Sequence, residues 1–208
     1  MTANILTALI LTVPSDSPFR TLYNILFFGL PRVGNLLPYT ASKFSVFKHL
    51  TWDKIELCHD GIIINLQVTK TFQNFDRVLH IPISGCNKRK EYCVVSGLNK
   101  MKSLKDYPMK PKDPVFNVYD EGKWAPMTKK RFGNFLKAHL EYLGIDSRLI
   151  TPSSFRKGGL SHMLLREGNM ELLRLQGDWI SDSYKRYLVI PAEQRFSVTS
   201  KALQNMPM

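Results

Sequence analysis

Residues 151–191 read TPSSFRKGGLSHMLLREGNMELLRLQGDWISDSYKRYLVIP, and this stretch decides which fold is expected. Its opening Thr-Pro-Ser-Ser is typical of a turn that caps a helix, which places Arg156 in the first helical turn. The pair Gly158-Gly159 lacks side chains and lets another backbone or a ligand approach closely. The apolar spacing at 170–175 predicts a second helix, and Trp179 follows it.

Three residue types in this stretch suit contact with a phosphodiester. An arginine holds phosphate oxygens with two parallel hydrogen bonds, and a tryptophan offers one N–H donor. A tyrosine hydroxyl can attack phosphorus. Tyr184 and Tyr187 both stand in the tyrosine-rich segment after Trp179, so residue type alone leaves both open as a nucleophile.

Five short strings carry a resemblance to a known family. They are GLPRVGNLLP at 29–38, TKTFQ at 69–73, SSFRKGG at 153–159, GDW at 177–179 and YKRY at 184–187. Together they resemble the tyrosine recombinases, or phage-integrase-like enzymes, and most of all the branch carried by eukaryotic Crypton- and DIRS-type mobile elements. The strings are spread over most of the chain.

The resemblance implies DNA strand cleavage and rejoining through a 3′-phosphotyrosine, in recombination or integration. The two arginines would clamp the non-bridging oxygens, and the lysine would protonate the leaving 5′ oxygen. The tryptophan would donate a hydrogen bond, and the family spacing favours Tyr187 over Tyr184 as the nucleophile. No cofactor or metal is implied, because arginines supply the charge. The implied catalytic set is Arg32, Lys70, Ser153, Arg156, Trp179 and Tyr187.

The chain departs from the family pattern at two positions of the site. Ser153 stands where the family has a histidine, and serine cannot share a proton near neutral pH as imidazole can. Asp178 adds a negative charge where the branch often has a basic residue. The remaining alternatives are a non-catalytic remnant that only binds DNA, and an RNA-binding or purely structural basic protein.

The overall composition points to a polyanionic partner. The 208 residues carry a formal net charge of +12, which favours nucleic acid over a membrane surface, although a merely soluble basic protein would share it. The apolar run at 5–13 is too short to span a bilayer. Cys58, Cys86 and Cys93 lack metal-ligand spacing and indicate free thiols in a reducing compartment, here expected to be the nucleus.

The pattern of elements predicts an α+β class, namely a mainly helical integrase-type catalytic domain with a small three-stranded antiparallel sheet. Helices are expected at 2–12, 19–30, 91–104 and 129–143, and strands at 50–57, 62–70 and 77–83. The residues expected to contact double-stranded DNA are Lys43, Lys129, Lys130, Arg131 and Lys157.

The expected domain organisation is a catalytic domain at 1–190 and a C-terminal tail at 191–208. The family's N-terminal core-binding domain, which closes around DNA, is expected to be absent. By the same resemblance, the tail would dock on a neighbouring protomer of a homo-oligomer on DNA. The docking residues would be Phe196, Val198, Leu203 and Met206.

Overall fold

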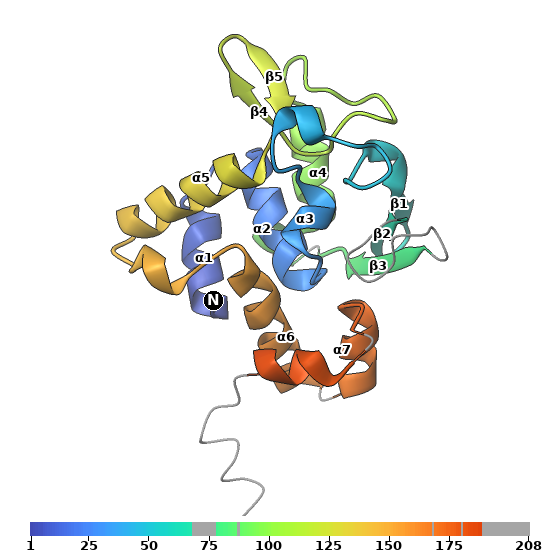
Figure 1. The fold of residues 1–208 in the computed structure, drawn as a ribbon, viewed down its shortest axis with the longest axis vertical. Coiled ribbons are helices and arrows are strands. Elements are labelled where there is room, and N and C mark those ends of the chain that lie inside the picture. Colours follow the sequence, from blue (N-terminus) through green and yellow to red (C-terminus); the bar gives the residue numbers. More distant parts are fainter. Residues whose placement is uncertain (68–77, 87, 168, 180, 189–208) are drawn as a thin grey trace, which may run out of the picture.

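The computed structural model describes residues 1–67, 78–86, 88–167, 169–179 and 181–188. The helices are α1 (Ala3–Leu11), α2 (Pro18–Phe28), α3 (Val33–Leu36), α4 (Val94–Lys102), α5 (Lys129–Tyr142), α6 (Ser153–Glu167) and α7 (Met170–Gln176). The strands are β1 (Ile55–Cys58), β2 (Gly61–Leu66), β3 (Leu79–Ser84), β4 (Asn117–Asp120) and β5 (Lys123–Pro126). Short 3-10 turns are η1 (Ala41–Lys43), η2 (Trp52–Lys54), η3 (Lys90–Tyr92), η4 (Ser147–Leu149) and η5 (Asp182–Tyr187). The α+β class predicted from the sequence is confirmed (Figure 1).

Helix α2 lies at the centre of the core and contacts α1, α4 and α6. The apolar sequence of α2 suits this central position, since its side chains Leu22, Tyr23 and Phe27 are all buried. Each such side chain contributes about 1.5–3 kcal/mol on burial. Pro18 fits the first turn, where its missing N–H costs nothing, and the helix ends at Gly29.

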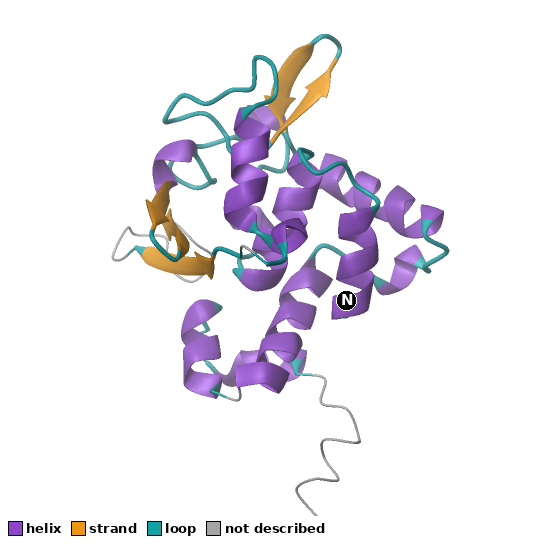
Figure 2. Ribbon diagram, turned by 180° about the vertical axis from the view of Figure 1, so that it is seen from behind, coloured by secondary structure: helices purple, strands orange, loops and turns teal. Residues whose placement is uncertain are grey.

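The close approach of α6 to α2 depends on Gly159. A Cβ atom placed there would overlap the carbonyl oxygen of Phe27. The expectation that this glycine admits another backbone is therefore confirmed. The contact brings the first turn of α6, with Arg156, to the C-terminal end of α2, and Figure 2 shows these helices from behind.

The three-stranded sheet is antiparallel in the order β1-β2-β3. Ile62, Ile64 and Ile81 on its inner face are buried in the same core as α2. The prediction of a strand over 50–57 was wrong at its start, since residues 52–54 form η2 instead. The turn is held by the Thr51 hydroxyl donating to Asp53 at 2.5 Å and the Lys54 N–H donating to the Thr51 carbonyl at 3.1 Å.

A second hairpin, β4–β5, was predicted only in part, since the sequence indicated an extended segment at 115–118 and a turn at 121–123 but no second strand. Glu121 and Gly122 at its tip have φ values of 48° and 80°, the left-handed pair that a tight two-residue hairpin turn requires. Trp124 on β5 packs edge-on against Tyr107 at 4.7 Å and Tyr119 at 5.2 Å between ring centroids.

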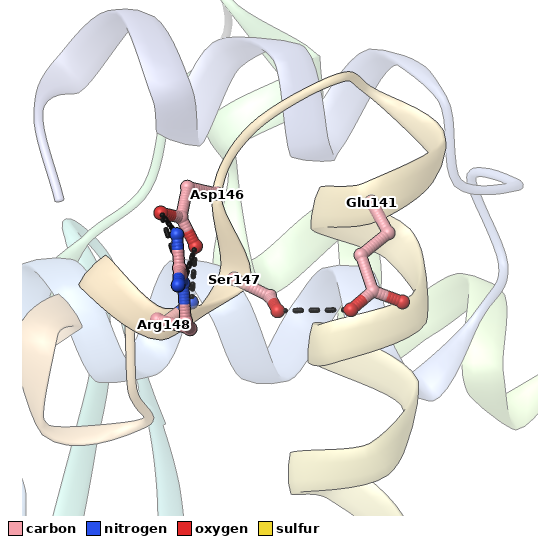
Figure 3. A network of polar contacts seen from close by, with 4 residues as sticks. All are labelled: Glu141, Asp146, Ser147 and Arg148. Atoms are coloured by element: carbon pink, nitrogen blue, oxygen red, sulfur yellow. Dashed lines mark hydrogen bonds and ion pairs between the residues drawn. The ribbon is translucent and has the colours of Figure 1, made fainter.

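The connection between α5 and α6 is a short polar turn, drawn in Figure 3. Thr128 caps the start of α5 and Gly144, at φ 70°, follows its end, both as expected. The Ser147 hydroxyl then donates to Glu141 at 2.9 Å, and Arg148 donates to Asp146 at 2.8 Å. The Arg148 guanidinium holds the pKa of the Asp146 carboxyl below its usual range.

Among the residues described, no helix combines the length and the apolar character needed to span a bilayer. The predicted tail at 191–208 and the predicted site residue Lys70 lie outside the described residues.

Candidate active site

The Arg156 guanidinium is fixed from several sides. The residue is 8% exposed, and one terminal nitrogen donates to the Leu30 carbonyl at 2.6 Å. The other terminal nitrogen donates to the Gly177 carbonyl. The guanidinium carbon also lies 4.1 Å from the centroid of the Trp179 ring, within cation–π range. Helix α6 thus supplies an arginine whose direction is set by the ends of α2 and α7.

Both carbonyls are presented by unusual backbone conformations. Leu30 follows the end of α2 with φ 55°, and Asp178 follows Gly177 with φ 52°. Residues other than glycine rarely adopt this left-handed region, and it recurs at functional sites. Position 177 has no room for a side chain, because a Cβ atom on Gly177 would overlap the Trp179 indole.

Arg32 reaches the same place from a different element. It is half-buried and precedes α3, on the segment that leads away from Leu30. Arg32 and Arg156 both line one small cavity of about 10 Å³. The structure therefore brings these two predicted site residues together. The rest of the lining is Leu30, Pro31, Asn35, Leu66, Leu79, Ile81, Gln176, Gly177 and Asp178.

The cavity carries a net positive charge at neutral pH. Arg32 and Arg156 are cationic, and Asp178, which is 6% exposed, is the carboxylate among the lining residues. One net positive charge beside oriented guanidinium donors suits an anion such as a phosphate oxygen. Asp178 lowers that charge, in line with the expectation that it adds a negative charge where the family branch often has a basic residue.

Trp179 and Tyr184 form a small apolar cluster with Leu30, Leu160 and Leu173. The two aromatic rings lie 6.1 Å apart between centroids, and Tyr184 is 5% exposed. Tyr184 is therefore a packing residue of this cluster. The backbone of Tyr187 belongs to η5, and its side chain lies outside the described part of the chain.

Ser153 is not among the residues that line the arginine cavity. It is exposed at the start of α6, and its hydroxyl shares a hydrogen bond of 2.8 Å with that of Thr151. Its catalytic role stays a prediction, as do the roles of the other five members of the predicted set, Arg32, Lys70, Arg156, Trp179 and Tyr187.

The residues predicted to contact DNA occupy several elements. Lys129 at the start of α5 lies against α3, since its Nζ would be 2.8 Å from a Cβ placed on Gly34. The other four are exposed, and Arg131 pairs with Asp120 at 3.2 Å. Lys129 therefore lies beside the Arg32 segment, since one residue separates Arg32 from Gly34.

Gln176 is a site residue that sequence reasoning missed. Its side-chain amide donates to the Phe28 carbonyl at 3.3 Å and to the Pro82 carbonyl at 2.8 Å. It thereby ties α7 to both α2 and β3 around the cavity. An exposed-looking glutamine at the end of an amphipathic helix gives no sequence signal for this role.

Within the described ranges, no three histidine, cysteine or acidic side chains are grouped so that they could hold a metal ion.

No protein-family model matches the chain, and no curated protein matches it. Among solved structures it is similar to two complexes of XerH site-specific recombinase. The pre-cleavage complex with difH substrate has a TM-score of 0.62 at 10% identity and covers 96% of this chain. The post-cleavage complex with palindromic difH substrate has a TM-score of 0.62 at 11% identity and also covers 96%. The chain has the fold of these recombinases. It spans about half their length, 53% of the first and 51% of the second.

Proposed function

We propose that this chain is the catalytic domain of a DNA tyrosine recombinase that cleaves and rejoins duplex DNA through a 3′-phosphotyrosine. The observation that carries the proposal is the cavity in which Arg32 and Arg156 meet. The recombinase fold supports it independently of any motif.

The arginine cavity suits the charge that develops during phosphoryl transfer. Negative charge accumulates on the non-bridging oxygens of the phosphate, and fixed cationic donors stabilise it without reorganising. Arg156 meets this requirement because the carbonyls of Leu30 and Gly177 and the ring of Trp179 fix its direction. Arg32 supplies the second cation from the segment before α3.

The remaining roles follow from the resemblance. The Tyr187 oxygen forms a bond to phosphorus and gives its proton to solvent, while the bond from phosphorus to the 5′ oxygen breaks. Lys70 gives a proton to that leaving oxygen, so a free 5′ hydroxyl results. Rejoining is the reverse reaction, in which a 5′ hydroxyl attacks the phosphotyrosine and releases Tyr187.

Covalent trapping tests the proposal directly. Nicked duplexes of random sequence lose a short 5′ fragment after cleavage, so the protein–DNA adduct cannot be resealed and survives a denaturing gel. The wild-type chain should form the adduct slowly, because Ser153 replaces an imidazole that would contribute about 10²–10⁴-fold. Tyr187→Phe should form none, whereas Tyr184→Phe should retain it.

A second candidate function is DNA binding without cleavage, which the exposed position of Ser153 favours. It would replace the first if the wild type binds the duplexes and neither it nor Ser153→His forms an adduct. An adduct that persists in Tyr187→Phe and disappears in Tyr184→Phe would instead reassign the nucleophile.

The finer assignments belong to the same proposal. The strings at 153–159 and 184–187 support an origin in a Crypton- or DIRS-like mobile element, and hence action in the nucleus. Recombination of two duplexes would require several protomers on DNA, with the tail at 191–208 as the segment that links them.

A further inference from the structure

All three cysteines of the chain line one groove of about 670 Å³. Cys58 lies on β1, Cys86 follows β3, and Cys93 precedes α4. Cys58 is exposed, Cys86 is half-buried and Cys93 is 6% exposed. The groove shares no lining residue with the arginine cavity.

Two of these cysteines are in direct contact. The Cys93 sulfur accepts the backbone N–H of Cys86 at 3.3 Å and that of Ser96 at 3.5 Å, as the cap of α4. The Cys86 sulfur accepts the backbone N–H of Arg89 at 3.3 Å. Cys58 differs, since its sulfur donates to the Glu56 carbonyl of its own strand, at 3.9 Å.

The contact places the two side chains within reach of a covalent bond. With an N–Cα bond of about 1.46 Å, the Cα atom of Cys86 lies about 4 Å from the Cys93 sulfur. A disulfide with an S–S bond of about 2.05 Å and a Cβ–Cβ separation of about 3.8 Å has a similar spacing. The spacing is therefore compatible with a disulfide once the Cys86 side chain turns away from Arg89.

We propose that Cys86 and Cys93 are a reversible redox site that closes to a disulfide when a peroxide oxidises it. Cys86, the more accessible of the two, attacks a peroxide oxygen as the thiolate and becomes a sulfenic acid, and the leaving hydroxide takes the proton that the Cys86 thiol released, giving water. The Cys93 sulfur then attacks the Cys86 sulfur, the S–O bond breaks, and the leaving hydroxide takes the Cys93 proton. Two thiols and one hydrogen peroxide thus give one disulfide and two waters.

The bond would close a ring around a basic turn. Lys88, Arg89 and Lys90 lie between the two cysteines and are all exposed. Oxidation would also link the end of β3 covalently to the start of α4. The site therefore controls how rigidly three consecutive cations are presented at the surface.

Mass spectrometry of the full chain tests this site without reference to DNA. After treatment with hydrogen peroxide, the intact mass should fall by two hydrogen atoms, and alkylation after unfolding should label only Cys58. Tryptic digestion should give linked peptides that contain Cys86 and Cys93, and dithiothreitol should restore three labelled thiols.

Serine variants supply matched controls. Cys58→Ser should keep the mass change, whereas Cys86→Ser and Cys93→Ser should each abolish it. Cys93→Ser retains a good helix-capping residue, and Cys86 is half-buried, so both variants can fold. Sulfinic acid without a disulfide, or disulfides through Cys58 between molecules, would overturn the proposal.

Discussion

Two main-chain carbonyls determine which way the Arg156 guanidinium points. A planar fork can donate to both with its central carbon 4.1 Å from the centroid of the Trp179 ring, whereas an ammonium group cannot match this geometry. The choice of arginine at this position is therefore structural as well as chemical.

Arg156→Lys should fold but lose activity. We expect a loss of about 1–3 kcal/mol in the free energy of unfolding, because one carbonyl loses its charged donor. Adduct formation should fall by about 10²–10³-fold, as for other fixed donors to a developing oxyanion. The control is Arg148→Lys, whose exposed pair with Asp146 lies outside the cavity. Denaturant unfolding and the trapping assay check both values, and wild-type rates in Arg156→Lys would contradict the role.

Asp178→Asn should strengthen DNA binding. The change raises the net charge of the cavity by one, and asparagine tolerates the left-handed backbone at this position. We expect an increase of roughly threefold to tenfold in affinity at low salt, measured by fluorescence anisotropy. Asp182→Asn, an exposed aspartate paired with Lys185, is the matched control. Equal effects of the two variants would mean that only overall charge matters.

Part of this site could be predicted from the sequence. Arg32, Arg156 and Trp179 stand in short strings. In the structure Arg32 and Arg156 line one cavity, and the Trp179 ring contacts Arg156. The Leu30 carbonyl and the Gln176 amide could not be predicted. The direction of a carbonyl depends on a backbone angle, and the partners of Gln176 depend on tertiary packing. The catalytic roles of all six predicted site residues stay predictions.

At the scale of elements, the crossing of α2 and α6 offers a sharp test of packing. Gly159→Ala should destabilise the protein by about 2–4 kcal/mol, because its methyl group would overlap the Phe27 carbonyl. Gly133→Ala, in the middle of α5 with open space around it, should instead stabilise by about 0.5–1 kcal/mol. Urea unfolding of the two variants should shift in opposite directions. If Gly159→Ala left the free energy of unfolding unchanged, α2 and α6 would be able to move apart without an energetic cost.

The elements that the sequence did not predict are short ones. Residues 50–54 have strand-like composition, yet Lys54 is buried and its ammonium donates to the carbonyls of Phe47 and His49. These hydrogen bonds of the buried Lys54 side chain outweigh the local preference of residues 50–54 for a strand. The β4–β5 hairpin has four-residue strands, and the sequence indicated its turn and one extended segment but not the pairing. The aromatic contacts around Trp124 that hold it depend on packing.

The loop before β1 should make stability depend on pH through His49. The ring is 4% exposed and accepts the Ser45 N–H at 3.0 Å, and burial, followed by nearby lysines, lowers its pKa from 6.5 to about 4. Between these values the unfolded chain binds a proton that the folded chain excludes, so stability falls as pH drops through this window. We expect a loss of about 1–3 kcal/mol.

His49→Asn should flatten that part of the pH profile, since asparagine can accept the same N–H without titrating. Urea unfolding between pH 7 and 4 measures the difference between the two proteins. His59→Asn, on an exposed histidine, controls for a change of residue type. A wild-type slope that survives in His49→Asn would assign the effect to other groups.

For the whole molecule, the charge of +12 predicts binding to DNA that weakens steeply with salt. The logarithm of the affinity should fall against the logarithm of salt concentration with a slope of about −0.9 for each phosphate contacted. Anisotropy titrations with duplex DNA and with RNA of equal length measure the slope and the preference together. A flat response would remove the DNA-facing interpretation of the basic surface, and a preference for RNA would favour a different partner.

Pro82 has a consequence for how molecules of this protein meet one another. It lies in β3, at an edge of the described three-stranded sheet, opposite Ile63. Within a strand the N and C=O of one residue point to the same side, and the Pro82 C=O already accepts the Gln176 amide. A further strand that paired with β3 at Pro82 would find no N–H donor there, and the Pro82 C=O would already be hydrogen-bonded to Gln176. Pairing of two molecules through the β3 edge is thereby disfavoured, and replacing both Pro82 and Gln176 should raise the thioflavin fluorescence of concentrated solutions above that of the wild type.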